Sequence, residues 1–158
     1  MCKKSGVKFI VNDDPFIANE VDADGVHLGQ EDLKKHSLVE TRNLLGQDKI
    51  IGISTHSLEQ FKKANEEDFD YVAFGPIFPT KTKDYFIGTG DVEKILAAAK
   101  KPIVFIGGIN LDNVDQILQK GARNIALIRA ILEADDISAA AARFKAKLKG
   151  GVLHEDKD

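Results

Sequence analysis

Residues 102–121 read PIVFIGGINLDNVDQILQKG, and this stretch contains the repeating unit of the fold. Pro102–Gly107 is a continuous apolar run, as expected of a strand in a parallel sheet that is covered on both faces. Asn110 is a residue type that caps the start of helices, and Gly121 suits the position just after a helix end. The stretch therefore predicts one strand followed by one helix.

The strand–helix order recurs along the whole chain. Five further apolar runs are expected to be strands, namely Val7–Asn12, Gly25–Leu28, Lys49–Ser54, Tyr71–Gly75 and Asn124–Arg129. Helices are expected after Asp14 and over Ser37–Gly46, Ser57–Glu67, Asn110–Gly121 and Ser138–Lys149. This alternation implies an α/β fold with a parallel sheet and right-handed crossovers. An open doubly wound sheet fits the order, and so does a TIM-barrel type (β/α)8 fold that is incomplete, with about six βα units.

The composition is that of one globular domain. The chain has 158 residues, of which 43% are hydrophobic, and this is enough apolar material to bury a core. We expect a single domain over residues 1–150 and a flexible polar tail over residues 151–158. The net charge of −3 argues against a nucleic-acid partner, because such a surface needs clustered Lys and Arg.

Cysteine usage and hydropathy point to a reducing compartment. Cys2 is the one cysteine of the sequence, so neither an internal disulfide nor a thiolate cluster for zinc can form. No apolar stretch approaches the about 20 residues that a membrane-spanning helix needs. We therefore expect a cytoplasmic protein without a membrane partner.

Polar residues gather where the predicted strands end. Asn12 and Asp13 close the first run, Asp32 follows the second, and Ser54 ends the third. In parallel α/β folds the carboxyl ends of the strands hold the ligands. Taken singly, Asp13 or Asp32 better suits a helix or turn cap, but together on adjacent strand ends the two carboxylates favour a Mg²⁺ site.

A second group of residues suits a phosphate. The long loop Pro76–Gly90 contains Thr80-Lys81-Thr82-Lys83, whose hydroxyls and ammonium groups could clamp an anion. Gly107-Gly108 leaves backbone N–H groups uncovered just before a predicted helix, and Arg129 ends the sixth run. An exposed polar loop and a simple tight turn are the alternatives for these two stretches.

Two histidines have different expected roles. His56 stands at a strand end, where an imidazole suits proton transfer. His27 lies inside a strand and is expected to be a hydrogen-bonded structural group.

Together these motifs resemble the thiamine-phosphate synthase family, also called thiamine-phosphate pyrophosphorylase. The stretches that carry the resemblance are FIVNDD (9–14), ADGVHLGQED (23–32), IGISTH (51–56), GPIFPTKTK (75–83) and IGGI (106–109). Their order and spacing also match, from about Ser5 to Leu148. The resemblance implies a (β/α)8 barrel that joins hydroxymethylpyrimidine pyrophosphate to a thiazole phosphate and releases pyrophosphate.

The resemblance also implies site residues and a cofactor. Asp13 and Asp32 would be the ligands of Mg²⁺. The small phosphorylated substrates would be bound by Asn12, Ser54, Thr80, Thr82, Lys83, Gly108, Ile128 and Arg129. Of these, Lys83 and Ser54 would be the catalytic residues.

The sequence departs from the family pattern in two places. The family usually begins with two further βα units that carry a Gln-x-Arg-x-x-x-Lys segment, which is absent from this sequence, so we expect an incomplete barrel. The open edges of such a barrel predict pairing with another copy of the chain. The last strand of the family commonly ends in a Val/Ile-Ser pair, whereas this chain has Ile128-Arg129.

Two other functions are compatible with the sequence. The related thiazole tautomerase, an isomerase, uses a histidine at the position of His56 for proton transfer. A catalytically impaired partial barrel that binds phosphate is the second alternative. The pair Asp13 and Asp32 and the Thr80–Lys83 loop favour the synthase over the tautomerase, because tautomerisation releases no pyrophosphate.

Overall fold

Every predicted strand is present, and four of the six are shorter than the apolar run that predicts them. The computed structural model describes residues 2–150, so the expected tail over residues 151–158 lies outside the described part. The strands are β1 (Ile10–Asn12), β2 (Gly25–Leu28), β3 (Ile50–Thr55), β4 (Tyr71–Phe74), β5 (Ile103–Ile106) and β6 (Ile125–Ala126). β2 has the bounds of its predicted run, and β3 keeps the length of its run, shifted by one residue.

The strands follow one another in the sheet as they do in the chain, in the order β1-β2-β3-β4-β5-β6. The pairs β1–β2 and β2–β3 are parallel, with Asn12 opposite His27 and His27 opposite Gly52. The pair β5–β6 is also parallel, with Phe105 opposite Ile125. This is the strand order that consecutive βα units produce.

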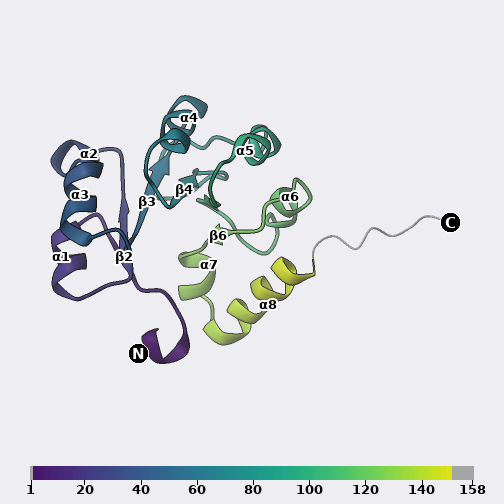
Figure 1. The fold of residues 1–158 in the computed structure, drawn as a ribbon. Helices are drawn as coiled ribbons and strands as arrows, with labels where there is room; N and C mark the ends of the chain where they lie inside the picture. The colour runs from purple at the N-terminus through teal and green to yellow at the C-terminus, as the bar shows by residue number, and fades with distance from the viewer. Residues whose placement is uncertain (1, 151–158) are drawn as a thin grey trace. The chain divides into compact units, whose positions relative to one another are not determined.

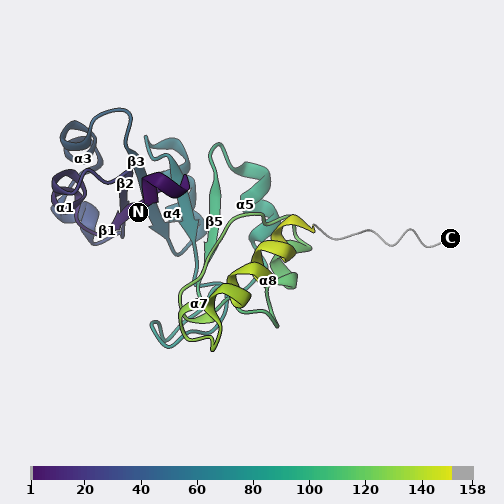
Figure 2. The same cartoon turned by 90° about the horizontal axis from the view of Figure 1, so that it is seen from below.

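The chain divides into two compact units, and each is described by itself. The first comprises the residues up to Ala73 together with Lys100–Pro102, and the second comprises Phe74–Ala99 and the residues from Ile103 onwards. In the first unit, helices α1 (Pro15–Glu20), α2 (Asp32–Lys35) and α3 (Leu38–Leu45) lie on one side of β2 (Figure 1). In the second unit, α7 (Arg129–Leu132) and α8 (Ile137–Lys149) lie side by side in both views (Figures 1 and 2).

The capping signals that predict helix starts are confirmed for α1, α3 and α4 (Leu58–Glu66). At α3, Glu40 N donates to Ser37 Oγ, and Ser37 N donates to Glu40 Oε2 at 3.0 Å, which completes the capping box. At α1, Asp14 Oδ1 accepts from Phe16 N at 2.8 Å. Ser57 caps α4 in the same way, and Asp136 caps α8, which begins one residue earlier than predicted.

Two predicted boundaries in the second unit are wrong. Helix α6 covers only Asp115–Leu118 instead of Asn110–Gly121. The Asn110 side chain accepts from the N–H groups of Asp112 and Asn113, so it closes a local turn in place of a helix start. The sixth strand ends at Ala126, and Arg129 is the first residue of α7 instead of the last of a strand.

Four elements have no counterpart among the predicted helices and strands. They are the 3-10 helix Cys2–Ser5, α2, α5 (Val92–Ala98) and α7. Each has only one or two turns, which is too short for a helical repeat of apolar residues to be recognised. Within residues 2–150, no helix is long and apolar enough to cross a bilayer.

Each unit buries its own set of branched and aromatic side chains. In the first unit, Val26 and Leu28 of β2 and Ile51 and Ile53 of β3 are fully buried, at 0% exposure. In the second unit the corresponding core residues are Val92, Ile95, Phe105, Val114 and Ile117. In β2 and β3, these alternate buried residues fix the register.

Arg42 of α3 is a buried charge that joins three segments of the first unit. Its side chain is only 7% exposed. Its Nη2 donates to Asp70 Oδ2 at 2.9 Å, its Nε to Asp68 Oδ2 at 3.2 Å, and its Nη1 to the Lys49 carbonyl at 2.6 Å. The same Asp70 oxygen accepts from Ile51 N at 2.7 Å. The guanidinium group thus ties α3 to the segments that lead into β3 and β4.

Replacing Arg42 by Met should lower the free energy of unfolding by about 2–3 kcal/mol, because backbone and carboxylate acceptors lose their donors. Asp68 and Asp70 stay partly hydrated, which limits the loss. Urea denaturation measures the effect. The exposed Arg143→Met on α8 removes the same charge and should leave stability within about 0.5 kcal/mol of wild type; equal effects of both variants would contradict this role of Arg42.

At the neighbouring residue Thr41, a substitution is expected to raise the free energy of unfolding instead of lowering it. It is 1% exposed, and its Oγ1 has no hydrogen-bond partner among the described residues. Thr41→Val should raise the free energy of unfolding by about 1 kcal/mol, since it removes a buried hydroxyl at constant shape. Thr41→Ser keeps the hydroxyl and should give no gain. A Val variant less stable than wild type in the same urea titration would show that the hydroxyl is satisfied.

Candidate functional site

The Asp13 backbone has an unusual conformation at the end of β1. Its φ is 71°, in the left-handed region that L residues seldom adopt. Asp13 N donates to the His27 carbonyl at 2.8 Å, so the β1–β2 ladder continues up to this residue. The next residue, Asp14, is held by its capping bonds to α1. The strained residue is therefore fixed on both sides, which is typical of functional positions.

Asp13 and Asp32 are close to each other in the first unit. Burial raises the pKa of the Asp13 carboxyl, and the negative charge and side chain of Asp32 raise it further. The Asn12 side chain acts in the opposite direction through a hydrogen bond to Asp13. Asp32 is itself fixed, because its Oδ2 accepts from Gly29 N at 2.8 Å. The structure thus brings together three of the predicted site residues, Asn12, Asp13 and Asp32.

Two adjacent carboxylates form an unbalanced pair that a cation would stabilise. Within residues 2–150 there is no cluster of three or more His, Cys, Asp or Glu side chains that could hold a metal. A site with two carboxylates still fits Mg²⁺, which commonly takes its remaining ligands from water and substrate phosphates. The donor set of Asp13 and Asp32 is therefore compatible with that ion.

Ser54 is positioned by a histidine and a tyrosine of the same unit. The two ring nitrogens of His27 lie 2.8 Å from Ser54 Oγ and 2.8 Å from the Tyr71 hydroxyl. The His27 and Tyr71 rings also stack, with centroids 5.5 Å apart. On the other side of Ser54, Gln30 Nε2 donates to its carbonyl at 2.6 Å. The prediction that His27 is a hydrogen-bonded group within a strand is confirmed.

Tyr71 is the member of this group that the sequence did not single out. The only signal for it is Gly52, which interrupts the apolar run of β3. A Cβ on Gly52 would lie 2.1 Å from the Tyr71 ring, so the ring occupies the space that a side chain would need. A glycine between two buried isoleucines is thus the mark of a neighbour that packs on the backbone.

Burial sets the protonation states of this pair. It lowers the pKa of His27 below its ordinary value and raises the pKa of Tyr71 to about 12. The charge of Asp32 acts on His27 in the opposite direction, which places the carboxylate near the imidazole. At neutral pH a neutral imidazole therefore lies between two hydroxyl groups.

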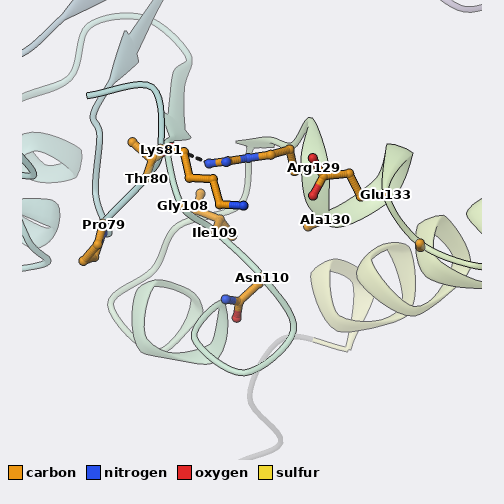
Figure 3. Close-up of a pocket in the computed structure, with 10 residues that line it drawn as sticks. Pro79, Thr80, Lys81, Gly108, Ile109, Asn110, Arg129, Ala130 and Glu133 are labelled. Carbon is orange, nitrogen blue, oxygen red and sulfur yellow. Dashed lines mark hydrogen bonds between the residues drawn. The ribbon is translucent and has the colours of Figure 1, made fainter. Parts of the chain in front are cut away.

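The second unit contains the predicted phosphate residues. Arg129 Nη2 donates to Thr80 Oγ1 at 2.7 Å (Figure 3). Thr80 Oγ1 also lies 3.1 Å from Thr82 Oγ1. Lys83 forms an isolated antiparallel bridge with Thr80, and its side chain is exposed. The loop thus brings the two hydroxyls and the guanidinium group together, while Lys83 extends into solvent.

The backbone of Gly108 lies so close to the backbone of Phe78 and Pro79 that only a glycine fits there. Its φ is 65°, and a Cβ would lie 2.4 Å from the Pro79 carbonyl oxygen. An open pocket of about 640 Å³ lies beside it, with Lys81 and Arg129 reaching into it from opposite sides (Figure 3). A smaller pocket of about 190 Å³ is lined by Thr80, Thr82, Gly108, Ile128 and Arg129, among others. Five predicted substrate-binding residues therefore line one cavity.

His56 belongs to the first unit. Its backbone N donates to Gln60 Oε1 at 2.7 Å, so the start of α4 holds this residue in place. A role in proton transfer stays a prediction.

Comparison with known proteins identifies the family of the chain. The family model described as "Thiamine monophosphate synthase" matches residues 1–131. The chain belongs to this family. The resemblance that the sequence motifs predict is therefore confirmed.

Curated relatives carry the name of the same enzyme. The thiamine-phosphate synthase of Persephonella marina is 42% identical over 147 residues, which cover 92% of this chain and 69% of the relative. That of Halalkalibacterium halodurans is 43% identical over 140 residues, covering 87% of this chain and 65% of the relative. The chain thus spans about two thirds of the length of these synthases. Both are named synthases, which favours the synthase over the tautomerase.

Solved structures confirm the fold class. The thiamine phosphate pyrophosphorylase of Pyrococcus furiosus superposes with a TM-score of 0.84 at 34% identity, covering 95% of this chain and 71% of that protein. The pyrophosphorylase of Bacteroides thetaiotaomicron has a TM-score of 0.57 at 19% identity, covering 89% and 67%, and shows the fold alone. The prediction of a TIM-barrel type α/β chain with six βα units is confirmed.

Because the pKa of His27 is lowered, the stability of the protein should depend on pH. Between the lowered value in the folded state and the ordinary 6.5, the unfolded chain binds more protons than the folded one. The free energy of unfolding should therefore fall as the pH falls through this window. Urea titrations from neutral pH to about pH 5 should show the fall in wild type and in His36→Gln. The fall should be smaller in His27→Gln, and an unchanged profile in that variant would contradict the assignment.

Proposed function

We propose that the chain is a thiamine-phosphate synthase-type transferase of thiamine biosynthesis. It would join hydroxymethylpyrimidine pyrophosphate to a thiazole phosphate and release pyrophosphate. The observation that carries the proposal is the proximity of Asp13 and Asp32. Asp13 has a strained backbone, and the Asp32 carboxylate is fixed by its bond to Gly29 N. A pyrophosphate-releasing reaction needs such a cation site, whereas tautomerisation does not.

Asp13 and Asp32 are the residues that would hold Mg²⁺. When bound, the ion would neutralise the charge that builds on the departing pyrophosphate. The residues of the chain provide the binding and orientation. Asn12, whose side chain bonds to Asp13, would contact the same phosphates. Ser54 would offer them a hydroxyl that His27 holds in place.

The chemistry needs no covalent nucleophile. The bond between the pyrimidine methylene carbon and the pyrophosphate oxygen breaks, and its electron pair leaves with the pyrophosphate. The lone pair of the thiazole nitrogen then forms the new C–N bond, which leaves a thiazolium cation. Lys83 would stabilise the leaving group with a positive charge, and Ser54 would donate a hydrogen bond. These are the two proposed catalytic residues.

The second unit would bind the phosphate of the thiazole. Thr80 and Thr82 offer hydroxyl groups, Gly108 permits close approach of the backbone, and Ile128 and Arg129 complete the cavity. The substrates are then two small phosphorylated molecules. Association with a second copy of the chain and a cytoplasmic location stay predictions.

Turnover tests the proposed activity directly. With both substrates and Mg²⁺ present, the protein should form thiamine phosphate and pyrophosphate in equal amounts, measured by chromatography. Lys83→Ala should lower kcat by about 10²–10³-fold, as expected when one charge-stabilising group is lost. Conversion of a thiazole tautomer at a rate unaffected by Asp32→Asn, without any pyrophosphate release, would support the isomerase instead.

The cation site is tested by binding. Calorimetry should show pyrophosphate binding that requires Mg²⁺ and that Asp13→Asn or Asp32→Ala weakens at least about tenfold, the loss expected for one charged ligand. The exposed Asp48→Asn removes the same charge elsewhere in the first unit and should bind as wild type does. Equal affinity in wild type and Asp32→Ala would exclude Asp32 as a ligand.

A further inference from the structure

We infer that Arg129 is a positioning residue that acts on a bound phosphoryl group through the hydroxyls of Thr80 and Thr82. The inference rests on the proposed function, because it takes a phosphoryl group as the ligand of the second unit. It assigns Arg129 a role different from direct contact. The guanidinium group fixes the direction of a hydroxyl chain so that the last O–H points to the ligand.

The donor directions follow from the side chains involved. An arginine has donors only, so at 2.7 Å Thr80 Oγ1 must accept from Arg129 Nη2. Thr82 N also donates to Thr80 Oγ1, at 3.5 Å. A hydroxyl oxygen has two acceptor positions and one proton, so these two donors occupy both of its acceptor positions. The Thr80 proton therefore points away from these two donors and can be donated to a further acceptor.

Thr82 Oγ1 is the acceptor at hand, 3.1 Å away. If Thr80 donates to it, the proton of Thr82 stays available for a further acceptor. The direction of the chain is thus Arg129 to Thr80 to Thr82, and it ends in an O–H donor. Successive hydrogen bonds of one direction polarise each other, by about 10–30% per bond. A permanently charged first donor makes the last hydroxyl a stronger donor to an anion.

The cavity shows where this donor acts. The smaller pocket of the second unit is lined by apolar side chains and glycine backbone apart from Thr80, Thr82 and Arg129. Arg129 also lines the larger pocket, where Lys81 faces it (Figure 3). A ligand in the smaller pocket thus meets the hydroxyl chain, backed by one positive charge. A phosphoryl oxygen is the acceptor that this arrangement favours.

A double-mutant cycle separates action through the hydroxyls from direct contact. The probe is inorganic phosphate, and the readout is its Kd from the NMR shift of the Gly108 amide in the full chain. Arg129→Met and Thr82→Val should each weaken binding about tenfold, the effect of one charge-assisted hydrogen bond. The double variant should be no weaker than about twice the worse single variant, because both changes break the same chain.

Three controls keep the test specific. Thr82→Ser retains the hydroxyl and should bind as wild type does, which a role of the Thr82 methyl group in packing would not allow. Arg143→Met removes one positive charge from α8, outside both pockets, and should leave the Kd unchanged. Arg129→Lys keeps the charge and a donor and should restore part of the affinity. Thermal melting of each variant confirms that it is folded.

The outcomes decide between the roles. Losses that multiply to about a hundredfold in the double variant would show that Arg129 and Thr82 contact the phosphate independently and would overturn the inference. An unchanged Kd in Arg129→Met, or no phosphate binding by the wild type, would overturn it as well. Phosphate binding needs no turnover, so absence of thiamine phosphate in the activity assay would refute the proposed function without deciding this cycle.

Discussion

The parallel register of β1, β2 and β3 is the constraint on which the first unit depends. Asn12 pairs with His27 and His27 with Gly52, so the carboxyl ends of the three strands lie at one edge of the sheet in a staggered order. The ladder extends to Asp13 through its bond to the His27 carbonyl. Because side chains alternate along a strand, a slip of one residue would turn His27 into the opposite face and separate it from Ser54. The core isoleucines and valines that fix the register therefore also fix the site.

The backbone conformation of Asp13 is energetically unfavourable. A non-glycine residue at a φ of 71° is destabilising by about 1–3 kcal/mol, and the structure adds a second acidic side chain beside it. Neither feature stabilises the apo protein. Both persist because Asp14 is held by the helix cap and Asp32 by the Gly29 amide. Strain and like charge at one point are reasonable only if a ligand offsets them, which is the physical basis for treating this pair as a binding site.

The sequence predicted the elements that have strong local signals. The strands and three helix caps follow from apolar runs and from side chains that bond to nearby N–H groups, and both depend on short-range chemistry. The predicted start of helix α6 was wrong because Asn110, a residue type that caps helices, closes a turn instead. Among site residues, Asp13 and Asp32 could be paired from their positions at adjacent strand ends. Tyr71 could not be predicted as a site residue from the sequence. Its role depends on its hydrogen bond to His27 and on the packing of its ring against Gly52, and no local sequence pattern marks these contacts.

The two units have opposite unbalanced charges in their candidate sites. In the first, burial and the nearby charge of Asp32 raise the pKa of Asp13. In the second, Arg129 and Lys81 face one pocket, which Glu133 also lines. In each unit a neutral hydroxyl, Ser54 or Thr82, is held in place by a neighbouring group and is ready to bond a ligand. Donors fixed before the ligand arrives lose little free energy to reorganisation when charge develops. Under the proposed function, a phosphorylated substrate together with a divalent cation would supply the opposite charges. This would explain why Asp13 and Arg129 form no salt bridge within the described residues, whereas many other surface charges of the chain are paired.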